Sequence, residues 1–380
     1  MINQLIRFVR EQYRTDQFIP LHAPVFAGRE RDYVLETIDS TFVSSVGAFV
    51  DRFEADTAAY TASPRAVATV NGTAALHMAL MLAGVKSGEL VLTQALTFVA
   101  TCNAIAYCQA EPVFIDVDRD TLGLSPTAMQ AWLEEHAMLD DEGLCRTRAG
   151  GQVVRACVPM HTFGHPAHID GLLAVCAGWN IALVEDAAES LGSFYKGRHT
   201  GTFGKLGILS YNGNKIITTG GGGMILANEE LGARAKFLTT TAKRPHPFEF
   251  FHDEVGYNYR LPNLNAALGC AQMEQIEQFV ASKRLLAGRY AELFAGSEFQ
   301  FVTEPAECRS NYWLNAVICE NAAHRDALLE STNAAGVMTR PIWQLMNRLP
   351  NYSACQHGDL RHSTWLADRV VNLPSSTIQG

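Results

Sequence analysis

The strongest constraint on the fold is a regular alternation of strand-like and helix-like segments between about residues 60 and 230. The β-rich stretch 65–70 precedes a segment of helical periodicity at 73–84. Further units, each a strand-like segment followed by a helix-like one, come next in the chain. Two more strand-like segments end the series at 206–212 and 223–228. Strands that alternate with helices form a mainly parallel sheet covered on both faces. We therefore predict an α/β fold with a large domain of this type.

The pattern changes after about residue 240, where the chain becomes rich in aromatic and charged residues without a clear period. The elements that we expect beyond this point are a helix over roughly 263–295, an antiparallel strand at 311–319 and a helix near 323–335. We predict a large domain over residues 1–240, beginning with a helix at 1–17, and a smaller α+β domain over residues 241–380.

Composition excludes several classes of protein. The formal charge is −9 with acids and bases interspersed, which argues against a nucleic-acid partner. No apolar run is long enough to cross a bilayer, and the first residues lack the apolar region of a signal peptide. Nine scattered cysteines without a C-x-x-C pair favour a reducing compartment. We expect a cytoplasmic protein with no membrane partner.

Polar and aromatic residues fall at the ends of several predicted strands, where open α/β sheets bind ligands. Gly72 and Thr73 lie at the start of one predicted helix, and Phe98 lies near the start of the next. Asp186 and Glu189 lie at the end of the strand at 181–186 and just after it, and Ser210 and Lys215 are placed in the same way at the strand at 206–212. The glycine run 220–223 follows Lys215 and indicates backbone that passes close to a neighbour or takes positive φ angles.

These residues together match the needs of pyridoxal phosphate. Its aldehyde requires a lysine, its pyridine nitrogen a carboxylate, and its phosphate the N–H groups of a helix start with nearby hydroxyls. Phe98 would stack on the ring. Taken singly, each feature is more typical of a turn, a helix cap or a surface charge, so the prediction depends on their occurrence together.

A cluster of histidines follows the predicted strand at 154–160. The spacing of His161, His165 and His168 could suit a metal, but no nearby cysteine or carboxylate completes a recognised zinc pattern. We predict no metal site and expect His161 to contact the cofactor or Asp186. The roles of His165 and His168 stay open.

Longer stretches of the sequence resemble one enzyme family. These stretches occur in the order seen in the DegT-type nucleotide-sugar aminotransferases, which are fold-type-I pyridoxal phosphate enzymes. They include NGTAALHMAL, ALTFVATCNAI, PMHTFGHPAHIDGL, VEDAAESLGS, SYNGNKIITTGGGGMI, GYNYRLPNLNAALG and NYWLNAVI. The resemblance extends over about residues 18–376. The stretches TTTAKRPHPFEFFHDEVGYNYRLPN and GVMTRPIW look most like the subgroup that acts on UDP-linked 4-keto-6-deoxy-N-acetylhexosamines, in routes to bacillosamine and legionaminic acid.

The resemblance implies a role for each candidate residue. Lys215 matches the lysine that forms the Schiff base and acts as general base, and Asp186 matches the partner of the pyridine nitrogen. Glu189 matches a residue beside the ring that is often glutamine, and Phe98 matches the aromatic residue that stacks on the ring. The residues that match the phosphate ligands are Gly72, Thr73 and Ser210. Asn258 matches a residue that reaches the phosphate from a neighbouring subunit, which implies a homodimer with shared active sites. Glutamate is the expected amino donor.

A UDP-sugar also needs local cations to bind its pyrophosphate on an acidic protein. Arg260 and Arg340 are our candidates, and Arg340 is the stronger one because Pro341 and Trp343 provide a rigid setting.

Several alternative functions compete with this one. A sugar 3-dehydratase of this fold would have histidine in place of Lys215. A 3-aminotransferase and a non-catalytic relative stay open. A dinucleotide-dependent oxidoreductase is disfavoured, because no G-x-G-x-x-G follows the first strand. The exact sugar, the position aminated, the donor and any oligomer beyond a dimer are not determined.

Overall fold

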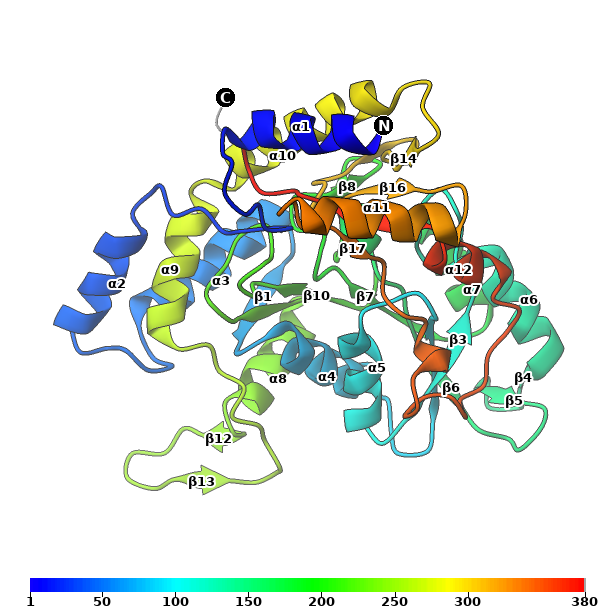
Figure 1. Ribbon diagram of the computed structural model, residues 1–380. Helices are drawn as coiled ribbons and strands as arrows, with labels where there is room; N and C mark the ends of the chain where they lie inside the picture. The colour runs from blue at the N-terminus through cyan, green and yellow to red at the C-terminus, as the bar shows by residue number, and fades with distance from the viewer. Residues whose placement is uncertain (379–380) are drawn as a thin grey trace.

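A seven-stranded sheet forms the centre of the computed structural model, which describes residues 1–378 (Figure 1). Its strand order is β1-β11-β10-β7-β6-β2-β3. The strands are β1 (Arg65–Thr69), β2 (Leu90–Gln94), β3 (Glu111–Ile115), β6 (Val154–Val158), β7 (Ala182–Asp186), β10 (Leu206–Ser210) and β11 (Gly223–Ala227). Neighbours from β10 to β3 are parallel, and β11 alone is antiparallel to both of its neighbours. The predicted mainly parallel sheet is confirmed.

Helices cover both faces of this sheet. One face packs against α4 (Gly72–Ala83), α5 (Val99–Tyr107) and α8 (Glu229–Thr239). The other packs against α3 (Ala48–Thr61), α6 (Pro126–His136), α7 (Ile169–Gly178) and α9 (Asn263–Met273). Successive strand residues point to opposite faces, so Ile208 of β10 joins the first core and Leu209 the second. Because both faces are covered, the central strands are apolar along most of their length.

A second, antiparallel sheet lies beyond the carboxyl ends of the central strands. Its order is β14 (Gln300–Phe301), β16 (Asn315–Ile318), β18 (Val370–Leu373) and β17 (Arg340–Pro341). It packs with α10 (Ile276–Phe294), α11 (Ala322–Ala334) and α12 (Arg361–Ala367). The antiparallel strand that we expected within 311–319 and the helix near 323–335 are confirmed.

The N-terminal helix α1 (Ile2–Tyr13) packs on this second sheet and not on the central one (Figure 1). Its buried residues Leu5 and Val9 share a core with Leu286 and Tyr290 of α10. Ile19 then forms a parallel bridge with Val337. The division at residue 240 stays a prediction, and the packing associates the start of the chain with its last third.

The single helix expected over 263–295 is wrong, because it is broken into α9 and α10 at Glu274 and Gln275. The Gln275 side chain donates to Glu30 Oε1 at 2.8 Å and to the Ala271 carbonyl at 3.0 Å. Glu30 begins α2 (Glu30–Asp39), which packs against α9. A polar contact between distant segments therefore stabilises the chain at the point where α9 ends and α10 begins.

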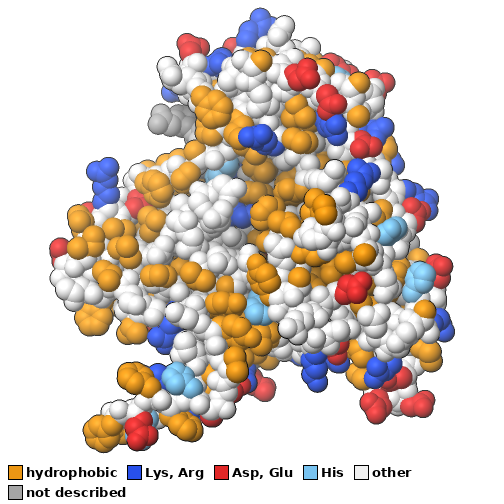
Figure 2. All heavy atoms as spheres, turned by 60° about the horizontal axis from the view of Figure 1, so that its bottom comes forward, with side chains coloured by type: hydrophobic (Ala, Val, Ile, Leu, Met, Phe, Trp, Pro, Cys, Tyr) orange, Lys and Arg blue, Asp and Glu red, His pale blue; other side chains and the backbone are white. Residues whose placement is uncertain are grey.

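A two-stranded arm, β12 (Lys243–Arg244) and β13 (Phe251–His252), projects from the body of the molecule (Figure 1). Figure 2 shows hydrophobic side chains gathered on it, and Phe248 and Phe250 are 93% and 81% exposed. The remaining short elements are β4 (Ala137–Leu139) with β5 (Cys145–Thr147), and β15 (Cys308–Arg309) with β8 (Phe194–Tyr195) and β9 (Arg198–His199). Across residues 1–378, no helix combines the length and apolar composition that crossing a membrane requires.

Candidate active site

A cavity of about 730 Å³ lies at the carboxyl ends of the central strands, next to the second sheet. Eight of the residues singled out in the sequence line it: Gly72, Thr73, Phe98, Asp186, Glu189, Ser210, Lys215 and Arg340. The first seven come from strand ends, loops and helix starts at the central sheet, and Arg340 comes from β17. The structure therefore brings the predicted lysine, carboxylates, hydroxyls and aromatic wall into one site.

Lys215 stands on a tight turn after β10, where its amide donates to the Asn212 carbonyl at 3.0 Å. Its Nζ lies 3.3 Å from Glu189 Oε1 and 4.0 Å from the centre of the Trp313 ring. The side chain is only 12% exposed. An amine held between a carboxylate and an aromatic face has a restricted position, which suits a group that must form a bond at one defined atom.

Glu189 is buried beside this amine. Burial raises the pKa of Glu189 to about 7, although the Lys215 charge and the Phe163 amide, which donates to Oε2 at 2.9 Å, both oppose the rise. Near neutral pH this carboxyl can therefore gain or lose a proton.

Asp186, which we predicted to bind the pyridine nitrogen, lies at the end of β7. Burial raises the pKa of this carboxyl, and a hydrogen bond from Thr101 Oγ1 to Oδ2 at 2.8 Å opposes the rise. The Ala188 amide donates to Oδ1 at 3.1 Å. A carboxylate accepts about four hydrogen bonds, so these two donors leave lone pairs for a ring N–H. A cationic ring would favour the ionised form of this carboxyl.

The start of α4, where we predicted the phosphate site, lies at the cavity. Asn71 caps the helix by accepting from the Ala74 amide at 2.7 Å, which leaves the first-turn N–H groups of Gly72 and Thr73 facing the cavity. A Cβ on Gly72 would lie 2.9 Å from Ser210 Cβ. Glycine at this position therefore allows the Ser210 hydroxyl to approach the helix start, where it joins the donors of an anion site.

The glycine run behind Lys215 has two structural reasons. Gly220 has φ +79°, which residues with a Cβ seldom adopt. A Cβ on Gly223 would lie 2.4 Å from the Asn71 carbonyl oxygen. The run therefore lets β11 begin directly against the cap of α4.

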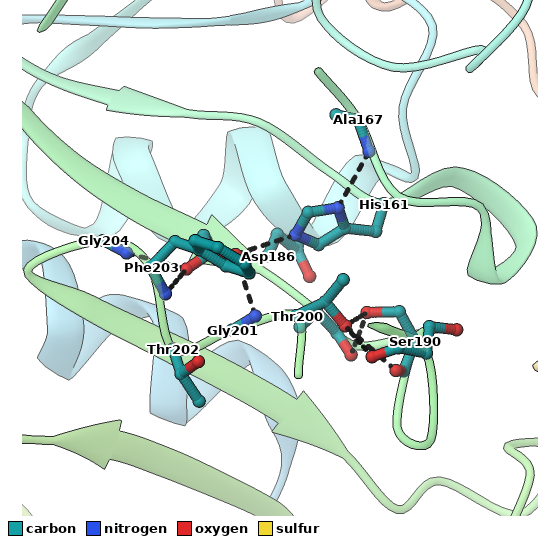
Figure 3. A network of polar contacts seen from close by, with 12 residues as sticks. His161, Ala167, Asp186, Ser190, Thr200, Gly201, Thr202, Phe203 and Gly204 are labelled. Carbon is teal, nitrogen blue, oxygen red and sulfur yellow. Dashed lines mark hydrogen bonds and ion pairs between the residues drawn. The ribbon is translucent and has the colours of Figure 1, made fainter. Parts of the chain in front are cut away.

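His161 does not line the cavity. Figure 3 shows the contact of its ring with Ala167. Its Nδ1 accepts from the Ala167 amide at 3.1 Å, so the proton of the neutral ring is on Nε2, which lies 3.0 Å from Glu185 Oε2. Its backbone N–H donates to the Asp186 carbonyl at 3.2 Å. His161 therefore meets Asp186 through the backbone, and its side chain contacts the preceding residue of β7.

Glu185 is completely buried and forms hydrogen bonds to several parts of this region. Besides His161, it accepts hydrogen bonds of 2.6 to 2.8 Å from the amides of Gly201, Phe203 and Gly204. Burial opposes ionisation, but these four donors hold the pKa of Glu185 below its ordinary value. The histidine and the loop 201–204 together fix the strand end that carries Asp186.

The other two histidines lie apart from the cavity and from each other. His165 is buried against Tyr312, and burial lowers the pKa of its ring to about 4. His168 Nε2 lies 2.9 Å from Asp120 Oδ2 at the surface, in a group that also includes Asp118. The three histidines do not converge on one point.

Asn258 and Arg260 also lie outside the lining of this cavity. Asn258 is exposed and forms an antiparallel bridge with Thr240 at the base of the arm. Arg260 is half-buried and its backbone bridges to Thr69. A role for Asn258 in the site of a second subunit agrees with this place, whereas Arg260 does not contribute to the cavity of its own chain.

Sequence reasoning did not single out Trp313 or Asn372, which also line the cavity. Trp313 lies in NYWLNAVI, one of the stretches that resemble the family, and this was the available signal. Asn372 lies in the short strand β18, where nothing in the local pattern indicates a ligand.

Comparison with known proteins gives the same assignment over nearly the whole chain. The profile of the DegT/DnrJ/EryC1/StrS aminotransferase family matches residues 25–378. EpsN of Bacillus subtilis (strain 168), described as a pyridoxal phosphate-dependent aminotransferase, is 37% identical over 334 residues, which cover 87% of this chain and 83% of EpsN. GDP-perosamine synthase of Escherichia coli O157:H7 is 33% identical over 362 residues, 94% of this chain and 93% of that enzyme.

A solved structure supports the same family assignment. The aminotransferase TlmJ from Streptoalloteichus hindustanus has a TM-score of 0.84 at 27% identity, with 94% of this chain and 93% of TlmJ covered. The fold is therefore that of the fold-type-I pyridoxal phosphate enzymes, and the residues around Lys215 fit the cofactor. The chain belongs to the DegT/DnrJ/EryC1/StrS aminotransferase family and is a pyridoxal phosphate-dependent sugar aminotransferase.

Proposed function

We propose that this enzyme transfers an amino group from glutamate to a UDP-linked 4-keto-6-deoxy-N-acetylhexosamine. The observation that carries the proposal is the single cavity that holds Lys215, Asp186 and the start of α4 on one side and Arg340 on the other. The first group suits the cofactor, and a guanidinium across the cavity suits an anionic substrate. The stretches 239–263 and 336–343 support the N-acetylhexosamine class through their resemblance to that subgroup.

Bound pyridoxal phosphate supplies an electron sink and carries the amino group between donor and acceptor. Asp186 would hold the protonated ring nitrogen, and Phe98 would form a wall of the ring site. Gly72, Thr73 and Ser210 would bind the phosphate. Their common effect is to fix the orientation of the ring relative to Lys215.

Lys215 has two tasks in this proposal. Its Nζ holds the cofactor until an amino donor replaces it, and then accepts the proton from Cα of the donor. Glu189, 3.3 Å away, keeps the released amine in place and exchanges a proton with it near neutral pH. With the ketosugar bound, the same amine returns a proton at the carbon that receives the amino group.

A GDP-linked 4-keto sugar is the second candidate, because relatives at 33% identity are named GDP-perosamine synthases. Arg340 would contact the pyrophosphate in either case, so it does not distinguish the two bases.

We also propose that the active form is a homodimer. The arm exposes Phe248, Phe250 and Val255 at its surface, which a monomer would leave in water. Asn258 stands at the base of this arm, outside its own cavity. A second copy of the chain that covers the arm would bring Asn258 toward the partner's phosphate site.

The test is to incubate the enzyme, loaded with cofactor, with glutamate and a panel of UDP- and GDP-linked 4-keto and 3-keto sugars. Nuclear magnetic resonance of the product identifies the carbon that bears the new amine. Turnover of GDP-sugars alone, or amination at C3, would overturn the proposal. The Lys215→Ala enzyme is the control for non-enzymatic amination.

A further inference from the structure

Asn372 is a buried amide of the cavity wall that has no use in the mechanism above. It lies in β18, is 4% exposed and lines the cavity. Within residues 1–378, its Nδ2 is buried and has no hydrogen-bond acceptor. Buried side-chain donors normally have a partner, so an isolated one at a ligand cavity points to an acceptor on the ligand.

The position of Asn372 associates it with the substrate and not with the cofactor. In the second sheet, Asn372 pairs with Arg340 of β17 on one side and with Ala316 of β16 on the other. Cross-strand partners present their side chains to the same face of a sheet. Asn372 and Arg340 therefore form one wall, across the cavity from the strand ends that carry Asp186 and Lys215.

The chemistry of this wall separates two kinds of acceptor. Arg340 is a cation and suits the charged pyrophosphate. Asn372 Nδ2 is a neutral donor and suits a neutral oxygen, of which an amide carbonyl is a stronger acceptor than a hydroxyl. A ligand without that oxygen would leave the donor unpaired, so the residue would discriminate against it.

We propose that Asn372 Nδ2 donates a hydrogen bond to the carbonyl oxygen of an N-acyl group on the sugar, and so determines the preference for N-acylated sugars. This inference rests on the proposed UDP-N-acetylhexosamine substrate. It adds a specificity-determining residue on the second sheet, away from the cofactor.

Two sugars that the enzyme cannot aminate, because they lack a keto group, provide a binding test. The affinities of UDP-N-acetylglucosamine and UDP-glucose are measured by calorimetry on the cofactor-loaded wild type and on Asn372→Leu, which keeps the size of the side chain. The wild type should bind the N-acetylated sugar about tenfold more tightly, as one well-placed hydrogen bond provides. Asn372→Leu should reduce this ratio to about twofold or less and leave the UDP-glucose affinity unchanged.

The exposed Asn351, which does not line the cavity, gives the matched control Asn351→Leu, and its ratio should equal that of the wild type. Melting temperatures without sugar separate recognition from a structural role. Asn372→Leu should melt no lower than the wild type, because it removes a donor that has no partner.

The inference is overturned if the wild type binds the two UDP-sugars with nearly equal affinity, or if the affinity ratio of the wild type persists in Asn372→Leu. Neither result contradicts the proposed substrate. A melting temperature several degrees lower in Asn372→Leu shows that Asn372 is structural and also overturns the inference. If neither UDP-sugar binds while GDP-mannose does, the proposed nucleotide fails and this inference fails with it.

Discussion

Lys215 Nζ and Glu189 Oε1 lie 3.3 Å apart, with side chains only 12% and 2% exposed. The carboxyl in this pair titrates near neutral pH because burial opposes its charge. The protonation of Glu189 therefore changes within the pH range in which most enzymes work, and the first prediction depends on this.

Glu189→Gln should change how stability depends on pH. The ordinary pKa of 4.5 rises to about 7 in the folded protein, so between these values the folded state keeps a proton that the unfolded state releases. Stability from this group is thus present below about pH 4.5 and is lost as pH rises to about 7. The change is a few kcal/mol at most, since one pKa unit is worth about 1.4 kcal/mol.

Urea unfolding of the cofactor-free wild type and of Glu189→Gln at pH 5, 6, 7 and 8 measures this effect. The free energy of unfolding of the wild type should fall relative to that of Glu189→Gln from pH 5 to pH 7, and the difference should then stay constant. Glutamine keeps an acceptor for the Phe163 amide, so the comparison isolates the charge. The same difference in unfolding free energy at all four pH values would contradict the raised pKa of Glu189.

Lys215→Ala should abolish transamination and the borohydride-reducible adduct, because Nζ is both the tether and the base. Mass spectrometry after reduction locates the adduct. The exposed Lys205 offers a matched control, and Lys205→Ala should keep both properties. Substantial turnover in Lys215→Ala, or an adduct on another lysine, would remove Lys215 from this role.

Asp186→Asn should still bind cofactor but lose roughly 100-fold or more in kcat, the usual loss when one preorganised electrostatic contact is removed. The amide can still accept from Thr101, so the local fold should persist. Absorbance gives cofactor occupancy and single-turnover kinetics give the rate. Full occupancy with a normal rate would contradict the assignment.

Arg340→Ala should raise the KM for the nucleotide sugar about tenfold or more and leave the glutamate half-reaction almost unchanged. Arg340 faces the cavity from β17, whereas the cofactor site lies at the central strands. Cofactor absorbance follows each half-reaction separately. Arg348→Ala changes an exposed arginine that does not line the cavity, and is the control. Equal effects on both half-reactions would show that Arg340 does not bind the nucleotide sugar.

Asn258→Ala should weaken cofactor binding, by about tenfold if one hydrogen bond to the phosphate is lost. Fluorescence titration gives this affinity, and analytical ultracentrifugation gives the oligomeric state. Diluting the wild type until it dissociates should release cofactor and activity together. A fully active monomer at assay concentration would contradict a shared site.

Much of this arrangement could be predicted from the sequence, because local patterns determine it. The strand periodicity located the ends of β7 and β10, and hence Asp186, Ser210 and Lys215. Features that depend on contacts between distant segments could not be predicted. At the break after α9, Gln275 contacts Glu30, which is 245 residues away in the chain. The partner of the His161 side chain likewise depends on how β6 and β7 pair. Asn372 enters the cavity only because β18 pairs with β17.

The packing of α1 against α10 and the second sheet has a consequence for synthesis of the chain. Leu5 and Val9 are synthesised before the central sheet, but their neighbours Leu286 and Tyr290 follow about 280 residues later. Proteins of this size commonly fold domain by domain from the N-terminus as they are made. Here the central sheet can be complete while the apolar face of α1 still has nothing to cover it. The first helix of the chain is therefore among the last to reach its final place.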